Sequence, residues 1–171
     1  MRNGLLLILV GLVAVLNGCA TGYARVAKAP EAAFGKYQIL ELPDLAGGGQ
    51  VPQEVKTDIP DKIAQELNKQ GLFAKVERGD TAVGESVLQL QGQVIQYNPG
   101  SRGMRYLTGP LLGAGKGSII VQVKFIDKAS GNDLSEATFE GEIKGGFFGG
   151  GIDETHDAIA KEIVQFIKSN F

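Results

Sequence analysis

The most reactive side chain in this sequence belongs to Cys19, which is the only cysteine among 171 residues. A thiolate is a good nucleophile near neutral pH, so Cys19 is a candidate for catalysis, metal binding or covalent modification. A disulfide within the chain and a cysteine-rich metal site are excluded, because there is no second cysteine. The use of the thiol therefore depends on the segment that precedes it.

A short hydrophobic segment stands before Cys19. Residues 1–18 carry one charge, on Arg2, followed by an uncharged apolar run over 4–16 and then Asn17 and Gly18. A basic start, an apolar centre and a small residue before the cut are the parts of a secretory signal peptide. The run is too short for a transmembrane helix, which needs about 20 apolar residues. We therefore expect residues 1–18 to direct export and to be removed.

Residues Leu16-Asn17-Gly18-Cys19 resemble the lipobox of bacterial lipoproteins, in which leucine, a variable residue and a small residue precede an obligatory cysteine. The resemblance implies a diacylglyceryl thioether on Cys19, cleavage before this residue and acylation of its new amino group. In the sorting rule of such lipoproteins, Asp directly after the cysteine keeps the protein in the inner membrane. In this sequence the residue after Cys19 is Ala20. We expect a lipid anchor in the outer membrane, facing the periplasm, or in the cell membrane of an organism without an outer membrane. The alternative is an ordinary signal peptide followed by an unpaired cysteine.

A glycine-rich stretch over 98–117 carries three cations, Arg102, Arg105 and Lys116. It departs from the nucleotide-binding P-loop pattern at two positions, and a strand is predicted after it where a P-loop needs a helix. Glycine turns and arginine side chains can nevertheless bind an anion, so these cations are candidate contacts for a partner or an anionic ligand. A long loop that is only solvated and pinned to the core is the structural alternative, which we favour.

Two aromatic residues, Phe147 and Phe148, stand between glycines just before the last expected helix. Exposed, they would offer an apolar contact to a partner or a bilayer. Folded inward, they would cover the end of the core. We favour the second arrangement, because exposed aromatic side chains are unfavourable in a soluble domain.

The single histidine, His156, lies among acidic residues, of which Asp153 is near enough on a helix to contact it. It also falls on the apolar side of that helix, so a buried structural residue is favoured over a catalytic base or a metal ligand. The sequence has no serine elbow and no paired-histidine motif. We therefore expect no enzyme activity, no catalytic residue, no metal and no cofactor.

The composition is that of a single globular domain. Removal of 18 residues leaves 153 of the 171, enough for a sizeable core, and 43% of the residues are hydrophobic. Of 17 Lys and Arg only Arg2 is lost, which leaves 16 against 19 Asp and Glu, a net charge of −3. This mild acidity argues against nucleic acid as a partner.

The first part of the mature chain predicts a linker, a strand and a helix. Residues 19–35 are rich in small residues without sustained periodicity, so we expect a flexible, lipidated tether. Residues 36–45 alternate as a strand does. Asp58 is a good N-cap for a helix over 59–70.

The remaining sequence predicts most of a sheet and a second helix. Alternating or β-prone segments predict four strands, over 73–77, 86–97, 118–127 and 134–144, of which the last two form a hairpin. An amphipathic helix with an acidic start and a basic end is expected over 152–169. Together these elements predict one α+β domain over 36–171, with two helices packed on one face of a mainly antiparallel sheet.

From about residue 37 to 167, the chain resembles a family of bacterial envelope lipoproteins known as domain of unknown function 4410. The residues that carry the resemblance are Tyr97-Asn98-Pro99-Gly100, Arg105-Tyr106-Leu107-Thr108-Gly109, Gly113-Ala114-Gly115-Lys116 and Asp127-Lys128-Ala129-Ser130-Gly131, followed by the terminal helix. Most of them are glycine and turn residues, which specify fold better than chemistry.

The function favoured by these observations is that of a non-catalytic interaction or assembly accessory module, anchored through acyl chains on Cys19. The expected partner is an envelope protein or a peptidoglycan-associated one, contacted through Arg102, Arg105 and Lys116, with Phe147 and Phe148 as further contacts. The alternative is a lipoprotein that binds a small ligand or an anionic glycan through the stretch 98–117.

Overall fold

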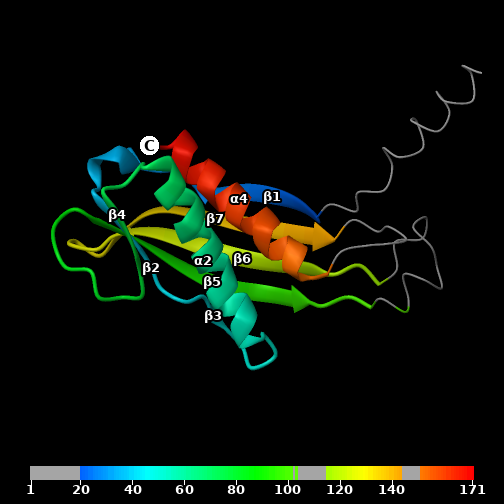
Figure 1. Ribbon diagram of the computed structural model, residues 1–171. Helices are drawn as coiled ribbons and strands as arrows, with labels where there is room; N and C mark the ends of the chain where they lie inside the picture. The colour runs from blue at the N-terminus through cyan, green and yellow to red at the C-terminus, as the bar shows by residue number, and fades with distance from the viewer. Residues whose placement is uncertain (1–19, 102, 104–114, 144–150) are drawn as a thin grey trace, which may run out of the picture.

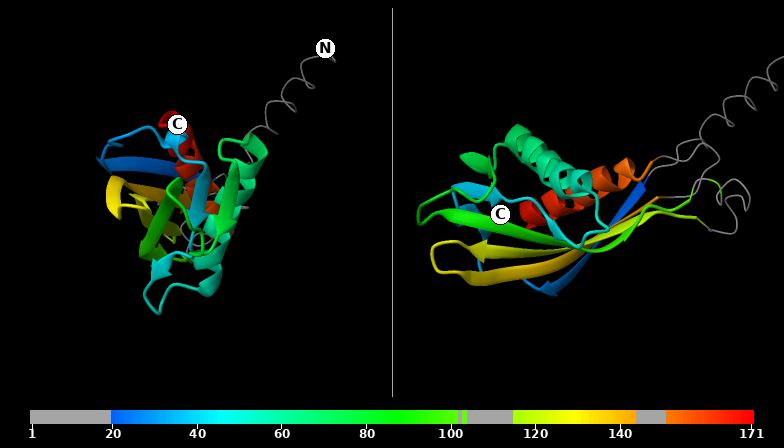
Figure 2. Two further views of the ribbon diagram at one scale, coloured as in Figure 1. Left: turned by 90° about the vertical axis from the view of Figure 1, so that its left-hand side faces the viewer. Right: turned by 90° about the horizontal axis from the view of Figure 1, so that it is seen from below.

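The computed structural model describes residues 20–101, 103, 115–143 and 151–171. Its described part is a seven-stranded sheet with two helices, α2 (Gln53–Gln70) and α4 (Asp153–Ser169), on one face (Figures 1 and 2). The strands are β1 (Ala20–Lys28), β2 (Ile39–Leu42), β3 (Ala46–Gly47), β4 (Lys75–Arg78), β5 (Val87–Asn98), β6 (Ser118–Asp127) and β7 (Asn132–Ile143), and a 3-10 turn, η2, covers Phe34–Lys36.

The order of strands in the sheet is β1-β7-β6-β5-β2-β4, with β3 beside β5. The three long strands β5, β6 and β7 are antiparallel neighbours, as is β1 on β7, whereas β2 runs parallel to β4 and β5. The predicted α+β class and the hairpin of β6 and β7 are therefore confirmed. The predicted strand over 118–127 matches β6 at both ends, while the strand predicted over 36–45 is only the four residues of β2.

The core lies between the sheet and the two helices. Alternate residues of the long strands point toward the helices, which gives β6 its regular alternation of buried and partly exposed side chains. Four aromatic rings form the centre of this layer. Phe34 stacks on Phe125 with ring centroids 4.9 Å apart, and Phe166 of α4 lies 5.3 Å from Phe125 and 5.9 Å from Phe139.

The flexible tether expected over 19–35 is wrong for most of its length. Residues 20–28 form β1, an edge strand paired with β7 from Ala20 opposite Ile143 onward. Phe34, near the end of the expected tether, is fully buried in the core. The sequence does not predict this strand, because the side facing α4 consists of glycine, alanine and a single valine, Val26, and therefore shows no alternation of large apolar residues.

Two glycines let α4 approach the sheet closely. Gly22 of β1 and Gly141 of β7 are neighbours in the register. A Cβ atom on Gly141 would lie 2.8 Å from the backbone oxygen of Thr155, and one on Gly22 would lie 2.9 Å from that of Ala158. The helix therefore rests on the backbone of both strands at this point.

Helix α2 starts six residues earlier than predicted. Asp58 lies inside the helix and does not cap it, and Pro60 also lies inside it. A proline has no N–H group to donate to the residue four positions before it, here Lys56. The backbone oxygen of Lys56 accepts the N–H of Leu45 instead, at 3.0 Å, which satisfies the group that the proline leaves free. The predicted end of the helix at Gly71, in the left-handed conformation, is confirmed.

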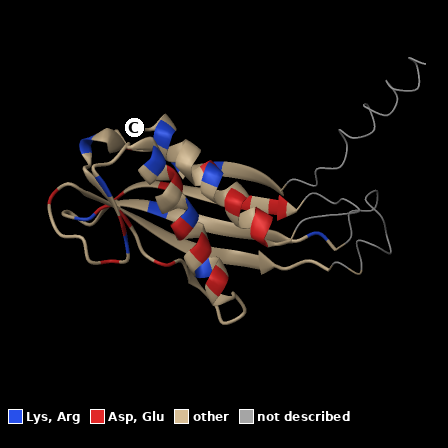
Figure 3. Cartoon of the chain, viewed as in Figure 1, with Lys and Arg blue, Asp and Glu red and all other residues tan. Residues whose placement is uncertain are grey.

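Both acidic and basic residues lie along α2 and α4 (Figure 3). Lys62 of α2 contacts Asp157 of α4 at 2.6 Å and joins the two helices on their outer side. Neither described helix is long and apolar enough to cross a membrane.

The close approach of α4 to the sheet predicts the effect of enlarging Gly141. Gly141→Val forces its side chain against the backbone of α4, so we expect the free energy of unfolding to fall by about 1–3 kcal/mol. Urea denaturation measures the change. Gly49→Val is the control, because no atom of the described residues lies within 4 Å of its Cβ position. Equal losses in both variants would contradict the close contact.

Candidate functional site

One end of the sheet contains Lys116, which the structure describes among the residues singled out for function, together with the first residues of β1. We call it the proximal end and define it by Ala20, Asn98, Ser118 and Ile143, which the strand register places at the same end of their strands. In Figure 1 it is the end at which β1 starts and β7 finishes. The opposite, distal end is the turn over 128–131, between β6 and β7.

The glycine-rich stretch has a hydrogen-bonded stem at the proximal end, formed by residues 98–101 and 115–117. The Asn98 side chain accepts the N–H of Gly100 at 3.0 Å and donates to the backbone oxygen of Lys116 at 3.3 Å. The N–H of Ser101 donates to the backbone oxygen of Gly115 at 2.9 Å. The two arms of the stretch are therefore joined past the ends of β5 and β6.

Close backbone contacts explain the glycines of this stem. Gly100 has a φ of +68°, and a Cβ there would lie 2.6 Å from the backbone oxygen of Gly115. A Cβ on Gly117 would lie 2.9 Å from Ile143 and 3.1 Å from Ile152. Gly100 and Gly115, two of the glycines that suggested a family, therefore hold the base of the loop.

Of the three predicted cations, the structure describes only Lys116. Its ammonium group lies 3.2 Å from a carboxylate oxygen of Glu142, across the pair of β6 and β7. Arg102 and Arg105 lie outside the described residues, as do Cys19, Phe147 and Phe148, so their roles stay predictions. Lys116 itself is engaged within the domain, which weakens it as a free anion contact.

His156 is a buried residue between the two helices, 2% exposed. Its Nδ1 lies 3.4 Å from a carboxylate oxygen of Asp58 in α2, and not against the Asp153 expected from helix spacing. Its Nε2 has no hydrogen-bond partner in the described part of the chain. This arrangement favours the structural interpretation of His156, since the ring is closed off from solvent.

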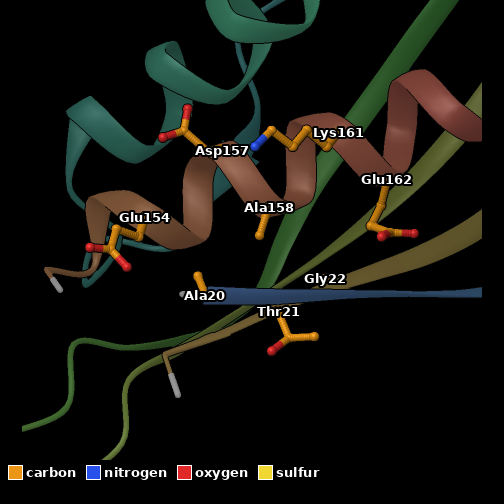
Figure 4. A pocket seen from close by; sticks show the side chains of 8 residues that line it. All are labelled: Ala20, Thr21, Gly22, Glu154, Asp157, Ala158, Lys161 and Glu162. Carbon is orange, nitrogen blue, oxygen red and sulfur yellow. The ribbon is translucent and has the colours of Figure 1, made fainter. Parts of the chain in front are cut away.

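An open groove of about 370 Å³ lies beside the first residues of β1 (Figure 4). Ala20 and Ala158 face each other across it, while the side chain of Thr21 leaves β1 on the other side. Acidic side chains outnumber basic ones on its rim, which carries Glu154, Asp157, Glu162 and Lys161. Among the residues that the structure describes, no group of three or more His, Cys, Asp or Glu side chains could hold a metal ion.

A buried carboxylate, that of Glu41, holds the distal half of the sheet together on the face away from the helices. Glu41 is fully buried and both of its oxygens lie 2.7 Å from the ammonium group of Lys128. Gln89 and the N–H of Ala82 donate to it as well, each at 2.7 Å. The hydrogen bond to Glu41 is the main cause that raises the pKa of Lys128. Sequence analysis missed this group, because Glu41 stands in an otherwise apolar strand.

A second polar contact joins the segment before β2 to the distal turn. The buried Tyr37 donates its hydroxyl to Asp127 at 2.9 Å, and the same carboxylate accepts the N–H groups of Ala129 and Ser130. Burial, followed by the bond to Asp127, raises the pKa of Tyr37. The bond from Tyr37, followed by that from Ser130, lowers the pKa of Asp127.

Comparison with known proteins identifies a family. The model of the family described as Domain of unknown function (DUF4410) matches residues 42–144. This interval includes the stem and the distal turn. No curated protein matches the chain.

The fold is similar to that of solved bacterial proteins. Two structures of PelC from Paraburkholderia phytofirmans, a variant and the unmodified protein, are both described as dodecamers. They share 23% and 20% identity with this chain, at TM-scores of 0.55 and 0.56, over 85% of this chain and 97% of theirs. Protein XCC0632 from Xanthomonas campestris shares 12% identity at a TM-score of 0.50, over 87% of this chain and 89% of its own. At these identities the likeness concerns the fold alone.

The stem geometry predicts that Gly100→Ala opens the base of the loop. The added Cβ meets backbone atoms and the residue must keep a positive φ, so we expect a loss of about 1–3 kcal/mol in unfolding free energy. Amide hydrogen exchange at Ser101 should become faster. Gly103→Ala is the matched control, since the nearest described atom, the hydroxyl oxygen of Ser101, is 4.0 Å from the Cβ position. Unchanged exchange at Ser101 in the Gly100 variant would contradict the stem.

The contact between Tyr37 and Asp127 predicts a window of pH in which it stabilises the fold. The lowered pKa of Asp127 gives stability that is present above about pH 4 and is lost as the pH falls through the folded value. The raised pKa of Tyr37 gives stability that is present below about pH 10 and is lost as the pH rises through the folded value.

Tyr37→Phe should therefore lower the unfolding free energy by about 1 kcal/mol at pH 7, with a smaller difference from the wild type at both extremes. Urea denaturation at a series of pH values measures it. Tyr23→Phe, at a half-exposed position of β1, is the control. A difference that stays constant from pH 3 to pH 11 would show that the hydrogen bond does not stabilise the fold.

Proposed function

We propose that this chain, which belongs to the DUF4410 family of domains of unknown function, is a non-catalytic lipoprotein that assembles with other proteins of the bacterial envelope. Acyl chains on Cys19 anchor it in the outer membrane, and its domain faces the periplasm. The lipobox-like residues before Cys19 support the anchor, and the absence of Asp at position 20 supports the location.

The free edge of β1 is the observation that carries the assembly proposal. Within the described residues, β1 pairs with β7 on one side and ends the sheet on the other. Its N–H and C=O groups on that side form a row without sheet partners, and the side chains of Tyr23 and Val26 remain 48% and 52% exposed. An edge of this kind is suited to pair with a strand of another chain.

Further copies of the same chain are the first candidate for the partner. The dodecamers of PelC support this choice, since PelC shares the fold over nearly its whole length. Another envelope protein, including one associated with peptidoglycan, is the alternative. A small anionic ligand has less support, because Lys116 is already paired with Glu142.

Photo-crosslinking in membranes tests the assembly proposal. A photo-reactive amino acid replaces Tyr23 on the edge of β1, or Val83, which is 89% exposed in the segment between β4 and β5. We expect crosslinked multiples of the chain from position 23 and none from position 83, read by gel mobility and mass spectrometry. Crosslinks to a different envelope protein at position 23 would name that protein as the partner. Equal products from both positions, or none from position 23, would overturn the proposal.

A further inference from the structure

We propose that the proximal end of the sheet rests on the surface of the lipid bilayer, held there by the direct connection between Cys19 and β1. This inference depends on the acylation of Cys19 in the proposed function. It specifies which end of the domain meets the lipid headgroups. It also means that the domain stays close to the bilayer, where a flexible tether would let it move away.

There is almost no chain between the anchor and the sheet. Ala20, the residue after Cys19, is paired with Ile143, and Thr21 is paired with Glu142. Consecutive Cα atoms are about 3.8 Å apart, so the acylated residue lies within about one residue of an ordered strand. A tether over 20–35 would instead have reached roughly 50 Å.

Strand β1 is fixed to the body of the domain along its whole length. At its start, Gly22 lies under α4, with the backbone oxygen of Ala158 only 2.9 Å from a Cβ position. At its end, the backbone oxygen of Lys28 accepts the hydroxyl of Ser135 at 2.8 Å. The chain then reaches the fully buried Phe34. Releasing β1 to act as a tether would therefore break the sheet pairing and disturb the core.

The direction of β1 sets the orientation of the domain. It begins at the proximal end and runs toward the distal end, antiparallel to β7, as Figure 1 shows. β7 has 12 residues, and at about 3.3 Å per residue it extends roughly 40 Å. The turn over 128–131 therefore points away from the membrane when the proximal end rests on it.

The charges that the structure describes at the proximal end do not form a basic cluster, so this inference rests on the anchor and not on electrostatic attraction. Lys116 is neutralised by Glu142, and the first turn of α4 carries the acidic residues Asp153 and Glu154. Attraction to anionic lipids requires a cluster of basic residues near the surface. The orientation set by β1 should therefore be kept on zwitterionic bilayers, which carry no net charge.

Fluorescence quenching on vesicles tests the orientation. The full-length chain is purified from membranes with a fluorophore on Asp153→Cys, near the proximal end, or on Ser130→Cys, in the distal turn. Acylation occupies Cys19, which leaves the introduced thiol as the one to be labelled. The vesicles are phosphatidylcholine with or without phosphatidylglycerol, and contain a lipid with a nitroxide on its headgroup. Two further proteins, one labelled at each position, have 16 Gly and Ser residues inserted between Cys19 and Ala20, a flexible linker with a reach of roughly 22 Å.

We expect several-fold stronger quenching at position 153 than at position 130, on phosphatidylcholine vesicles as well as on those that contain phosphatidylglycerol. The inserted linker should bring the two positions close to the same quenching. Equal quenching in the chain without the insert, after intact-mass analysis has shown acylated Cys19, would overturn this inference alone. An intact mass with bare Cys19 would overturn the proposed function itself, and the inference with it.

Discussion

The contact of α4 with the backbone of β1 and β7 is the constraint on which the rest of this structure depends. Gly22 and Gly141 stand side by side beneath the helix, and any side chain there would meet the helix backbone. The approach brings Phe166 of α4 onto Phe125 and Phe139 of the sheet, and Phe34 completes the cluster. The same approach turns the residues after Cys19 from a linker into a part of the domain.

Hydrophobic periodicity predicted the elements whose buried side is made of large apolar residues. The alternation of Ile119, Val121, Val123 and Phe125 identified β6 with its bounds, and the apolar face of α4 identified that helix to within one residue. β1 gave no such signal, because the side that faces α4 is mostly glycine and alanine and no residue of the strand is fully buried. The start of α2 was misplaced for a different reason. Pro60 is typical of the first turn of a helix, and its place inside α2 depends on the hydrogen bond from the N–H of Leu45 to the backbone oxygen of Lys56, which the sequence does not reveal.

In the candidate site, too, the sequence revealed residue types but not the contacts between residues far apart in the chain. The glycines of the stem were visible in the sequence, but the contact of Gly100 with Gly115 depends on how the two arms of the loop meet. Lys116 looked like a free cation, because its pairing with Glu142 requires the register of β6 and β7. His156 was expected to be buried, yet its partner Asp58 comes from another helix, ninety-eight residues away in the sequence. Spacing along one element cannot reveal contacts of these kinds.

The anchor and the free edge of β1, taken together, restrict how copies of this chain can associate. When every copy has Cys19 in the same leaflet and a proximal end on the bilayer, every β1 runs away from the membrane. Two β1 edges cannot then pair antiparallel, because one of the two anchors would point away from the lipid. Copies in one membrane are then related by rotation about the membrane normal, and any rotation other than a two-fold one brings the edge of β1 against a different surface of the next copy. Such head-to-tail contacts close into rings or continue without limit, depending on the rotation between neighbours. With Cys19 acylated as proposed, the attachment of β1 therefore restricts copies of this chain to arrangements whose rotation axes stand along the membrane normal.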